Sequence, residues 1–202
     1  MTEKKFDLPI TRYPDGKAFI GNTIDGKPDG TGWLFDEPKY YGDFKKGLKH
    51  GTGRLFFNSG IKIVAEFKEG KFHGKRTIYD PNKKCVIFEK LDNDEILERE
   101  TYMHDGTINC IKYQNGKKHG IELLSLKDGT PIQIMYENGE RVKHPQTGDI
   151  NGSAGDPDPE FLNENLKAFN HHKERMEKEI IWRLPDEVTE QINDFINKKK
   201  NE

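Results

Sequence analysis

The sequence predicts a mainly β protein: an elongated, twisted antiparallel sheet of repeated β-hairpins of about 23 residues, then a linker and two C-terminal α-helices. The first observation is a recurring phrase, Gly-x-x-His-Gly, at residues 47–51, 70–74 and 116–120. The second is a set of short runs with period-two alternation, separated by turn-forming residues. The third is a change to helical spacing of apolar residues after residue 160.

The repeat has a fixed period and phase. The first two phrases start 23 residues apart, the third starts two such periods later, and Asn93 stands where a glycine would be due in a degenerate middle copy. Four copies carry an aromatic residue three positions before the lead glycine: Phe44, Phe67, Tyr113 and Tyr136. Each unit reads as two strands and two turns. Because a lone hairpin is marginally stable, successive hairpins are expected to pair edge to edge, with the aromatics stacked along one face and covering neighbouring glycines.

Composition fits an elongated fold. Hydrophobic residues make up 32% of the 202-residue chain and charged residues 34%, as expected where each unit buries little surface. The net charge of −2 argues against sequence-independent nucleic-acid binding. Cys85 and Cys110 form no CxxC pair and read as buried, reduced thiols. No apolar signal core or membrane-length run occurs in the sequence, which predicts a soluble, intracellular, cytoplasmic protein, compatible with a cytoskeletal or organelle-associated assembly.

Four segments follow in order: an N-terminal capping segment (1–17), the hairpin repeats (18–142), a Gly- and Pro-rich linker (143–159) and a helical segment (160–202). The first helix is expected over about 160–183. Its apolar stripe consists of Leu162, Leu166, Phe169, Met176 and Ile180, closed by Trp182. Pro185 ends this helix and opens a second one.

The stretch at residues 41–53, Tyr-Gly-Asp-Phe-Lys-Lys-Gly-Leu-Lys-His-Gly-Thr-Gly, resembles a membrane occupation and recognition nexus (MORN) repeat. The looser copies at residues 66–74 and 113–120 are similar to a bacterial variant of that repeat. The resemblance covers roughly residues 18–142. It implies an extended antiparallel sheet used as a scaffold that tethers at membranes, binds helical partners or builds cytoskeletal assemblies.

No catalytic, cofactor or metal site is predicted. The sequence lacks a nucleophile elbow, a P-loop, an HExxH motif and a dinucleotide fingerprint, so we expect a non-enzymatic protein without cofactor. His50, His73 and His119 recur two strands apart, about 10 Å, which is too far to share one zinc ion, so they are expected to cap loops. Residues 149–160 resemble a calcium loop, but Ala154 replaces its required glycine, which favours a linker.

The sequence therefore predicts a scaffold or assembly subunit that binds protein partners through the repeat sheet and the C-terminal helices. The candidate contact residues are Phe44, Phe67, Tyr113, Tyr136, Leu166, Phe169, Met176, Ile180 and Trp182. The first four, which belong to the sheet, serve either as core or as contact residues. Residues 160–183 either fold back on the sheet or dock on a partner. A first alternative is a peripheral membrane adaptor that binds anionic lipid through Lys45, Lys46, Lys49, Lys117 and Lys118. A second is a bacterial-type inhibitor or immunity-like protein that neutralises a toxin.

Overall fold

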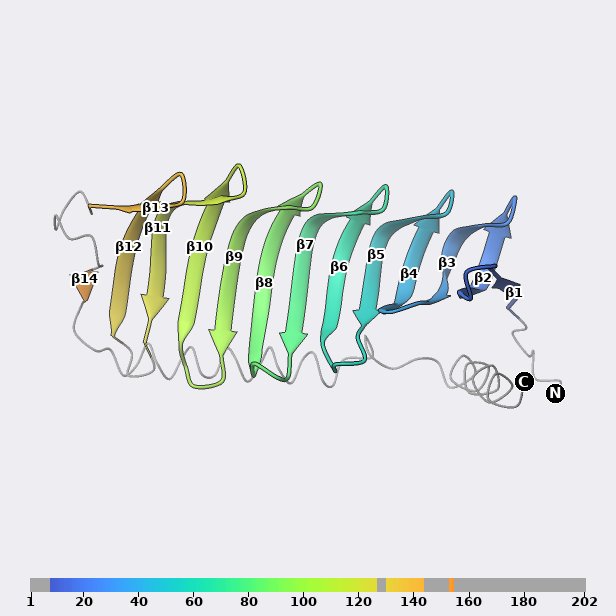
Figure 1. Cartoon of the computed structure of the whole chain (residues 1–202), viewed down its shortest axis with the longest axis horizontal. Helices are drawn as coiled ribbons and strands as arrows, with labels where there is room; N and C mark the ends of the chain where they lie inside the picture. The colour runs from blue at the N-terminus through green and yellow to red at the C-terminus, as the bar shows by residue number, and fades with distance from the viewer. Residues whose placement is uncertain (1–7, 127–129, 144–152, 155–202) are drawn as a thin grey trace, which may run out of the picture.

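A computed structural model describes residues 8–126, 130–143 and 153–154. They form one open antiparallel sheet in which neighbours in sequence are neighbours in space from β1 to β13 (Figure 1). The strands are β1 (Ile10–Arg12), β2 (Ala18–Ile24), β3 (Lys27–Phe35), β4 (Lys39–Lys45), β5 (Leu48–Phe56), β6 (Lys62–Lys68), β7 (Lys71–Asp80), β8 (Cys85–Asp92), β9 (Glu95–Met103), β10 (Ile108–Gln114), β11 (Lys117–Ser125), β12 (Pro131–Glu137), β13 (Glu140–Val142) and β14 (Ser153–Ala154). The predicted mainly β, antiparallel architecture is confirmed, and the predicted C-terminal helices lie outside the described residues.

Two-residue turns join the strands along one edge of the sheet, the upper edge in Figure 1. In the β4–β5 turn, Lys46 and Gly47 have φ of 53° and 85°, the positive pair that a type I′ hairpin turn requires. The lead glycine of each phrase is thus the second turn residue.

The structure corrects the predicted position of the turn in the middle copy of the repeat. Asn93 and Asp94 both have positive φ, 47° and 72°, so Asp94 and not Asn93 stands in the glycine position, one residue later than expected. Leu91, which is buried, lies three residues before Asp94 and takes the place of the repeat aromatic. The middle copy therefore has one extra residue before its turn and an aliphatic side chain, Leu91, in place of the aromatic. These two differences are why the motif does not match it.

A register shift follows the two-residue turn in the hairpins β2–β3, β4–β5, β6–β7, β8–β9 and β10–β11. Within the β4–β5 hairpin, Gly42 pairs with Gly53 but Asp43 pairs with His50, which leaves Gly51 in a β-bulge with φ of 59°. A Cβ on Gly51 would lie 2.7 Å from Asp43 Oδ2. The second glycine of the phrase therefore serves the bulge.

The turns are also bound to one another. The Gly47 amide donates a hydrogen bond to the carbonyl of Pro28 in the preceding hairpin, and Gly70 repeats this bond to Lys49, both at 2.8 Å. Gly139 does the same to Lys118. Successive hairpins are thereby held in a fixed register at this edge.

Alternation of side chains gives the sheet two distinct faces. We call face A the side that carries Phe19, Tyr40, Leu55 and Ile63, which form one buried cluster with Phe44 and Phe67. Face B is the opposite side and carries Ile20, Trp33, Tyr41 and Phe56. The hydrophobic core is therefore divided between two sides of a single layer.

The expected aromatic stacking is corrected in detail. Phe44 lies edge-on to Phe19 (5.1 Å between ring centroids) and to Tyr40 (5.0 Å) instead of covering a glycine. The rings that cover glycines are those of Phe19, over Gly32, and Tyr40, over Gly53. Phe19 and Tyr40 are the first face A residues of β2 and β4, and both lie outside the repeated Gly-x-x-His-Gly phrase.

Short strands cover both ends of the sheet. β1 pairs with the first part of β2. At the other end, β13 pairs with Met135–Glu137 of β12, and β14 pairs with Ile132 and Gln133 of the same strand. The outer edge of β12 is thus occupied along most of its length, which protects it from pairing with another chain.

Candidate protein-interaction surface

Face B presents a continuous row of paired residues that crosses the sheet from β3 to β11. The row reads Trp33, Tyr41, Arg54, Val64, Thr77, Phe88, Glu100, Cys110 and Leu123. Eight strand intervals at about 4.8 Å make it roughly 38 Å long. Hairpin pairing alone therefore aligns side chains that lie up to 90 residues apart in sequence.

An aromatic stack occupies the β3 end of this row. The Trp33 indole stacks on Tyr41, with 4.9 Å between ring centroids, and on Phe56, with 5.5 Å, both at 28° between planes. The Arg54 guanidinium lies 5.7 Å from the centroid of the Tyr41 ring. Trp33 is only 4% exposed. Trp33 is therefore part of the core, and the half-buried Tyr41 and Phe56 form the accessible part of this rigid stack.

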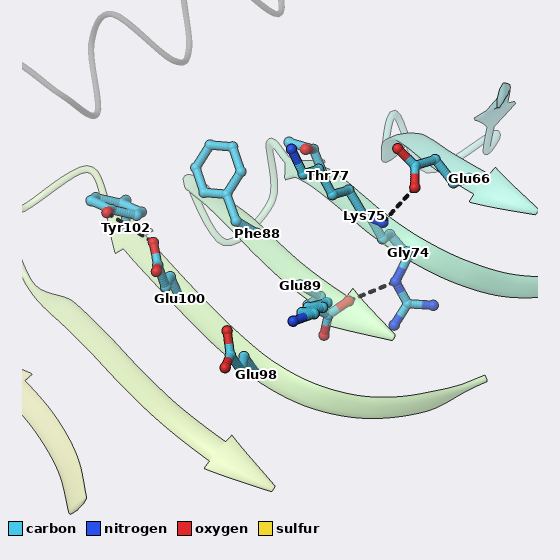
Figure 2. A pocket seen from close by; sticks show the side chains of 11 residues that line it. Glu66, Gly74, Lys75, Thr77, Phe88, Glu89, Glu98, Glu100 and Tyr102 are labelled. Atoms are coloured by element: carbon cyan, nitrogen blue, oxygen red, sulfur yellow. Dashed lines mark hydrogen bonds and ion pairs between the residues drawn. The ribbon is translucent and has the colours of Figure 1, made fainter. Parts of the chain in front are cut away.

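A hollow of about 560 Å³ follows over β7–β9. Figure 2 shows Thr77, Phe88 and Tyr102 standing on the same side of these strands and lining it. The Phe88 and Tyr102 rings meet edge to face, 5.7 Å apart at 86°. A space of this size holds a small ligand or one or two large side chains.

Carboxylates border the hollow on β9. Glu98 and Glu100 both line it, and the Tyr102 hydroxyl donates a hydrogen bond of 3.2 Å to Glu100 Oε2. Burial, and then the nearby Glu100 charge, raises the pKa of Tyr102 to about 12. Glu98 also pairs with Lys112 at 3.6 Å, a contact between two exposed side chains. Lys75, Arg76 and Lys90 line the hollow as well, and Lys90 pairs with Glu98 across β8 and β9. The hollow therefore combines aromatic walls with a border of mixed charge.

Exposed aliphatic side chains lie at the β11 end of face B. Ile121 is 44% exposed and Leu123 is 49% exposed, and Met135 pairs with Ile121 across β11 and β12. Two large apolar residues that are half exposed on one strand mark a surface suited to a contact. Face B thus runs from stacked rings through a hollow of mixed charge to an aliphatic end.

The sheet aromatics predicted from sequence lie elsewhere. Phe44, Phe67 and Tyr136 are buried on face A, each 6% exposed or less. Tyr113 is half-buried on the same face, with the Arg99 guanidinium 5.7 Å from its ring centroid. All four therefore serve the core. The C-terminal candidates Leu166, Phe169, Met176, Ile180 and Trp182 lie outside the described residues.

The five predicted lipid-binding lysines do not form one patch. Lys45, Lys46 and Lys117 are exposed near the two-residue turns. Lys49 Nζ lies 4.9 Å from the Tyr40 ring centroid, where burial lowers the pKa of this lysine. Lys118 Nζ lies 2.6 Å from Glu122 Oε1. Two of the five cations are therefore already engaged with the sheet.

A buried ion triad crosses the middle of face A. The Glu89 side chain is fully buried and accepts hydrogen bonds from Arg76 Nε at 2.6 Å and Arg99 Nε at 2.7 Å. It stands in the row that Gly42, Gly53 and Ala65 occupy in earlier repeats. The triad fixes the register of β7, β8 and β9 and was not predicted from sequence.

The described part of the chain shows no group of three or more His, Cys, Asp or Glu residues able to hold a metal ion. His73 Nδ1 lies 3.0 Å from Asp92 Oδ1 but without the alignment of a hydrogen bond. Nor does that part of the chain contain a helix that could cross a membrane.

Sequence reasoning missed the face B residues Trp33, Tyr41, Phe56, Phe88 and Tyr102. They occupy two positions relative to the second turn residue: Tyr41 and Phe88 lie six residues before Gly47 and Asp94, and Trp33, Phe56 and Tyr102 lie fourteen residues before Gly47, Gly70 and Gly116. Neither position lies within the repeated Gly-x-x-His-Gly phrase, and the one-residue shift of the middle copy hides Phe88, so a search for that phrase passes over them. The available signal was strand alternation, because Tyr40 and Tyr41 are adjacent and must point to opposite faces.

No family model matches the chain, and no curated protein sequence matches it either. Among solved structures, the TCP10 domain of Danio rerio CPAP is similar at 16% sequence identity, covering 74% of this chain and 99% of that one, with a TM-score of 0.21. The same domain in complex with a peptide of Danio rerio STIL is similar at 16% identity, covering 74% and 92%, with a TM-score of 0.22. Superpositions this loose carry no argument about function.

Proposed function

We propose that this chain is a non-enzymatic scaffold or assembly subunit that binds protein partners through face B. The observation that supports this most is the unbroken register row from Trp33 to Leu123, with stacked rings at one end, a hollow in the middle and exposed aliphatic side chains at the other. Aromatic anchors beside a pocket are the features that carry most of the binding energy in protein interfaces.

The shape of face B favours a helical partner. The row runs across the strands for about 38 Å, a length that a helix of about 25 residues matches at 1.5 Å per residue. Strand addition is disfavoured at the β12 edge, because β13 and β14 already occupy most of it. An amphipathic helix laid across the strands would place its apolar stripe on this row.

We also propose that the repeats are of the MORN type. The glycines of the phrase at residues 47–53 have separate structural uses, which support the resemblance: Gly47 in a type I′ turn, Gly51 in a bulge and Gly53 beneath the Tyr40 ring. These uses explain why the spacing within the phrase is fixed.

A membrane adaptor is a second candidate, supported by the exposed turn lysines Lys45, Lys46 and Lys117. Each lysine near an anionic surface contributes about 1 kcal/mol at most, so three exposed ones give weak, salt-sensitive binding. Sedimentation with vesicles that contain phosphatidylserine checks it: binding that the triple change to alanine abolishes would favour the adaptor over the scaffold.

The scaffold function is tested by filling the hollow. Thr77→Trp places a large ring among Phe88 and Tyr102 while keeping a residue that favours strands. Thr101→Trp is the matched control, because Thr101 pairs with Ile87 on face A of the adjacent strand β9. Both full-length variants are used as bait against extract of the native cells, and captured proteins are quantified by mass spectrometry.

We expect Thr77→Trp to reduce capture of the specific partner at least tenfold and Thr101→Trp to leave it within twofold of the unchanged chain. Equal capture by all three chains, with folding verified by circular dichroism, would contradict binding at face B.

A further inference from the structure

We infer that face A carries a second interaction surface, next to the two-residue turns, which binds an acidic segment of a protein partner. It goes beyond the proposed function, because it lies on the opposite side of the sheet from face B. We call this surface the turn-side row. It consists of Lys49, Phe72, Lys118 and Arg141, each two positions after the second residue of its turn, and of the aromatic residues that pair with them across each hairpin.

Basic residues recur on face A once in every two strands. They are Lys49 on β5, Arg76 on β7, Arg99 on β9, Lys118 on β11 and Arg141 on β13. Strands two apart in the sheet lie about 9.6 Å from each other, so the five basic residues span roughly 38 Å. The repeat therefore produces a periodic line of positive charge.

The lysine heads lie over the rings of this row. Lys49 Nζ lies 5.8 Å from the centroid of the Phe67 ring, and Lys118 Nζ lies 4.8 Å from that of Tyr136. At the end of the row, Arg141 Nε donates a hydrogen bond of 3.2 Å to the Tyr136 hydroxyl. A cation held over a ring face keeps its other side available to an anion.

The two remaining arginines reach the same row from one position further along their strands. The central guanidinium carbon of Arg76 lies 4.5 Å from the centroid of the Phe72 ring, and that of Arg99 lies 5.7 Å from that of Tyr113. All five cationic heads therefore gather over the turn-side row.

The acidic side chains on this side of the sheet are buried. Within the described strands β4 to β13, face A carries Asp80, Glu89 and Glu122, which are 6%, 5% and 5% exposed. Asp80 accepts hydrogen bonds from turn amides, Glu89 from the two arginines, and Glu122 from Lys118 and Asn109. Five basic residues against these three acidic ones give a net charge of +2.

The charge that reaches solvent along the row is positive. The Arg99 side chain is 35% exposed, and Arg141 is exposed. Outside the strands, Asp36 lies near Lys49 but is paired with Lys17 at 3.3 Å. Charge complementarity therefore favours an anionic partner.

The spacing favours an acidic peptide among anions. Every third residue of an extended chain recurs at about 10 Å, close to the interval of about 9.6 Å between the cations. A nucleic acid carries a charge about every 3.4 Å of each strand, roughly three for each cation of the row. A lipid surface would meet only cations that project from the sheet, and the Arg76 side chain is 15% exposed.

Two fluorescein-labelled peptides test the surface with the full-length protein. In the spaced peptide, five glutamates stand at every third position, with glycine, serine and alanine between them, and cover roughly 40 Å when extended. The clustered peptide has the same composition, with its five glutamates consecutive. Binding is measured by fluorescence anisotropy at about 20 mM salt, where surface charges are weakly screened.

We expect the spaced peptide to bind at least threefold more tightly than the clustered one, and to lose at least fivefold in affinity at about 200 mM salt. Equal binding of the two peptides, or binding of neither, would overturn the inference.

A pair of double variants locates the binding. Lys49→Gln with Arg141→Gln removes the two end cations and leaves the buried carboxylates with their partners. Lys68→Gln with Lys71→Gln is the matched control, because these exposed lysines pair with each other on face B beside the β6–β7 turn. We expect the first variant to weaken binding of the spaced peptide at least fivefold and the second to change it less than twofold.

Equal weakening by both double variants would reduce the effect to net charge and overturn the row. If circular dichroism shows the first one to be unfolded, Arg141→Gln alone, at an exposed side chain, should still weaken binding at least twofold, and unchanged binding would overturn the inference.

Other anions are tested alongside. A thymidine oligonucleotide and vesicles that contain phosphatidylserine are titrated with the same proteins. Tighter binding of either than of the spaced peptide, lost in the variant at Lys49 and Arg141, would overturn the acidic peptide in favour of nucleic acid or lipid.

The two faces are separable in these experiments. Thr77→Trp, on face B, should leave peptide binding within twofold. Thr101 lies about 13 Å from the turn-side row, because its pair Asn109 is four residues from Tyr113, so substitutions at Thr101 leave the row open. If the peptide does not bind while Thr77→Trp loses the captured partner, the scaffold function stands and the second surface fails.

Discussion

Replacing Gly53 by alanine should destabilise the sheet through a single side chain. A Cβ on Gly53 would overlap three atoms of the Tyr40 ring and hydroxyl. The ring has nowhere to go: it is fully buried, lies edge-on to Phe44 at 5.0 Å and to Phe67 at 5.5 Å, and its hydroxyl donates a hydrogen bond to the Asp43 carbonyl at 3.1 Å. The φ of Gly53 is not in the left-handed region, so alanine suits the backbone and the cost is steric.

The expected magnitude follows from overpacking a tight core, which costs about 1–3 kcal/mol. Because Tyr40 is held on three sides, we expect the upper end, about 3 kcal/mol. For a chain of this length each kcal/mol lowers Tm by about 2–4 °C, so Gly53→Ala should lower it by about 6–12 °C. Urea denaturation followed by the fluorescence of Trp33 and Trp182 measures the loss.

The control is the same substitution in a Tyr40→Leu background. Removing the ring removes the overlap, so the cost of Gly53→Ala should fall below about 1 kcal/mol, giving a coupling energy of about 2 kcal/mol between the two positions. A cost below about 0.5 kcal/mol in the original chain, or an equal cost in both backgrounds, would refute the packing of Tyr40 over Gly53.

Two further predictions concern charged and titrating groups. Glu89→Gln should cost about 3 kcal/mol in urea denaturation, because it leaves Arg76 and Arg99 without their buried carboxylate, whereas Glu98→Gln, at an exposed pair, should cost less than about 1 kcal/mol; similar costs would contradict a buried triad. Because the pKa of Tyr102 is raised to about 12 in the folded chain, folding favours the protonated phenol: its contribution to stability is complete below about pH 10 and is lost as pH rises through about 12. Tyr102→Phe should therefore flatten the fall in stability above about pH 10, and an unchanged slope would count against this burial.

Much of the fold was predictable because glycine, turn and alternation signals are local. Gly47 and Gly70 mark two-residue turns wherever they stand, and the strands between them alternate with period two. The middle copy escaped because Asp94 adopts positive φ without being glycine, helped by a side chain that accepts a hydrogen bond from the Phe72 amide at 2.7 Å. A motif search has no access to that compensating bond.

The surface was less predictable than the fold, because it depends on which residues face each other across strands. Trp33 and Phe88 are 55 residues apart in sequence, and only the summed register of β3 to β8 places them on one row. Each bulge shifts the pairing of the two strands, and the size of the shift cannot be read from the sequence. Aromatic residues at a fixed position in the repeat, such as Phe67, could be found from the sequence. They recur with the repeat because each repeat contributes one side chain to the core at that position.

The most direct test of the central claim is site-specific photocrosslinking on face B. The photoreactive residue p-benzoylphenylalanine replaces Thr77 in the hollow in one full-length chain and Thr101 on face A in another, and both are irradiated in the native cells. Face B as the interaction surface predicts adducts from position 77 that map to a helical segment, either of a partner protein or of residues 160–183, and few adducts from position 101. Adducts from position 101 with none from position 77 would contradict it.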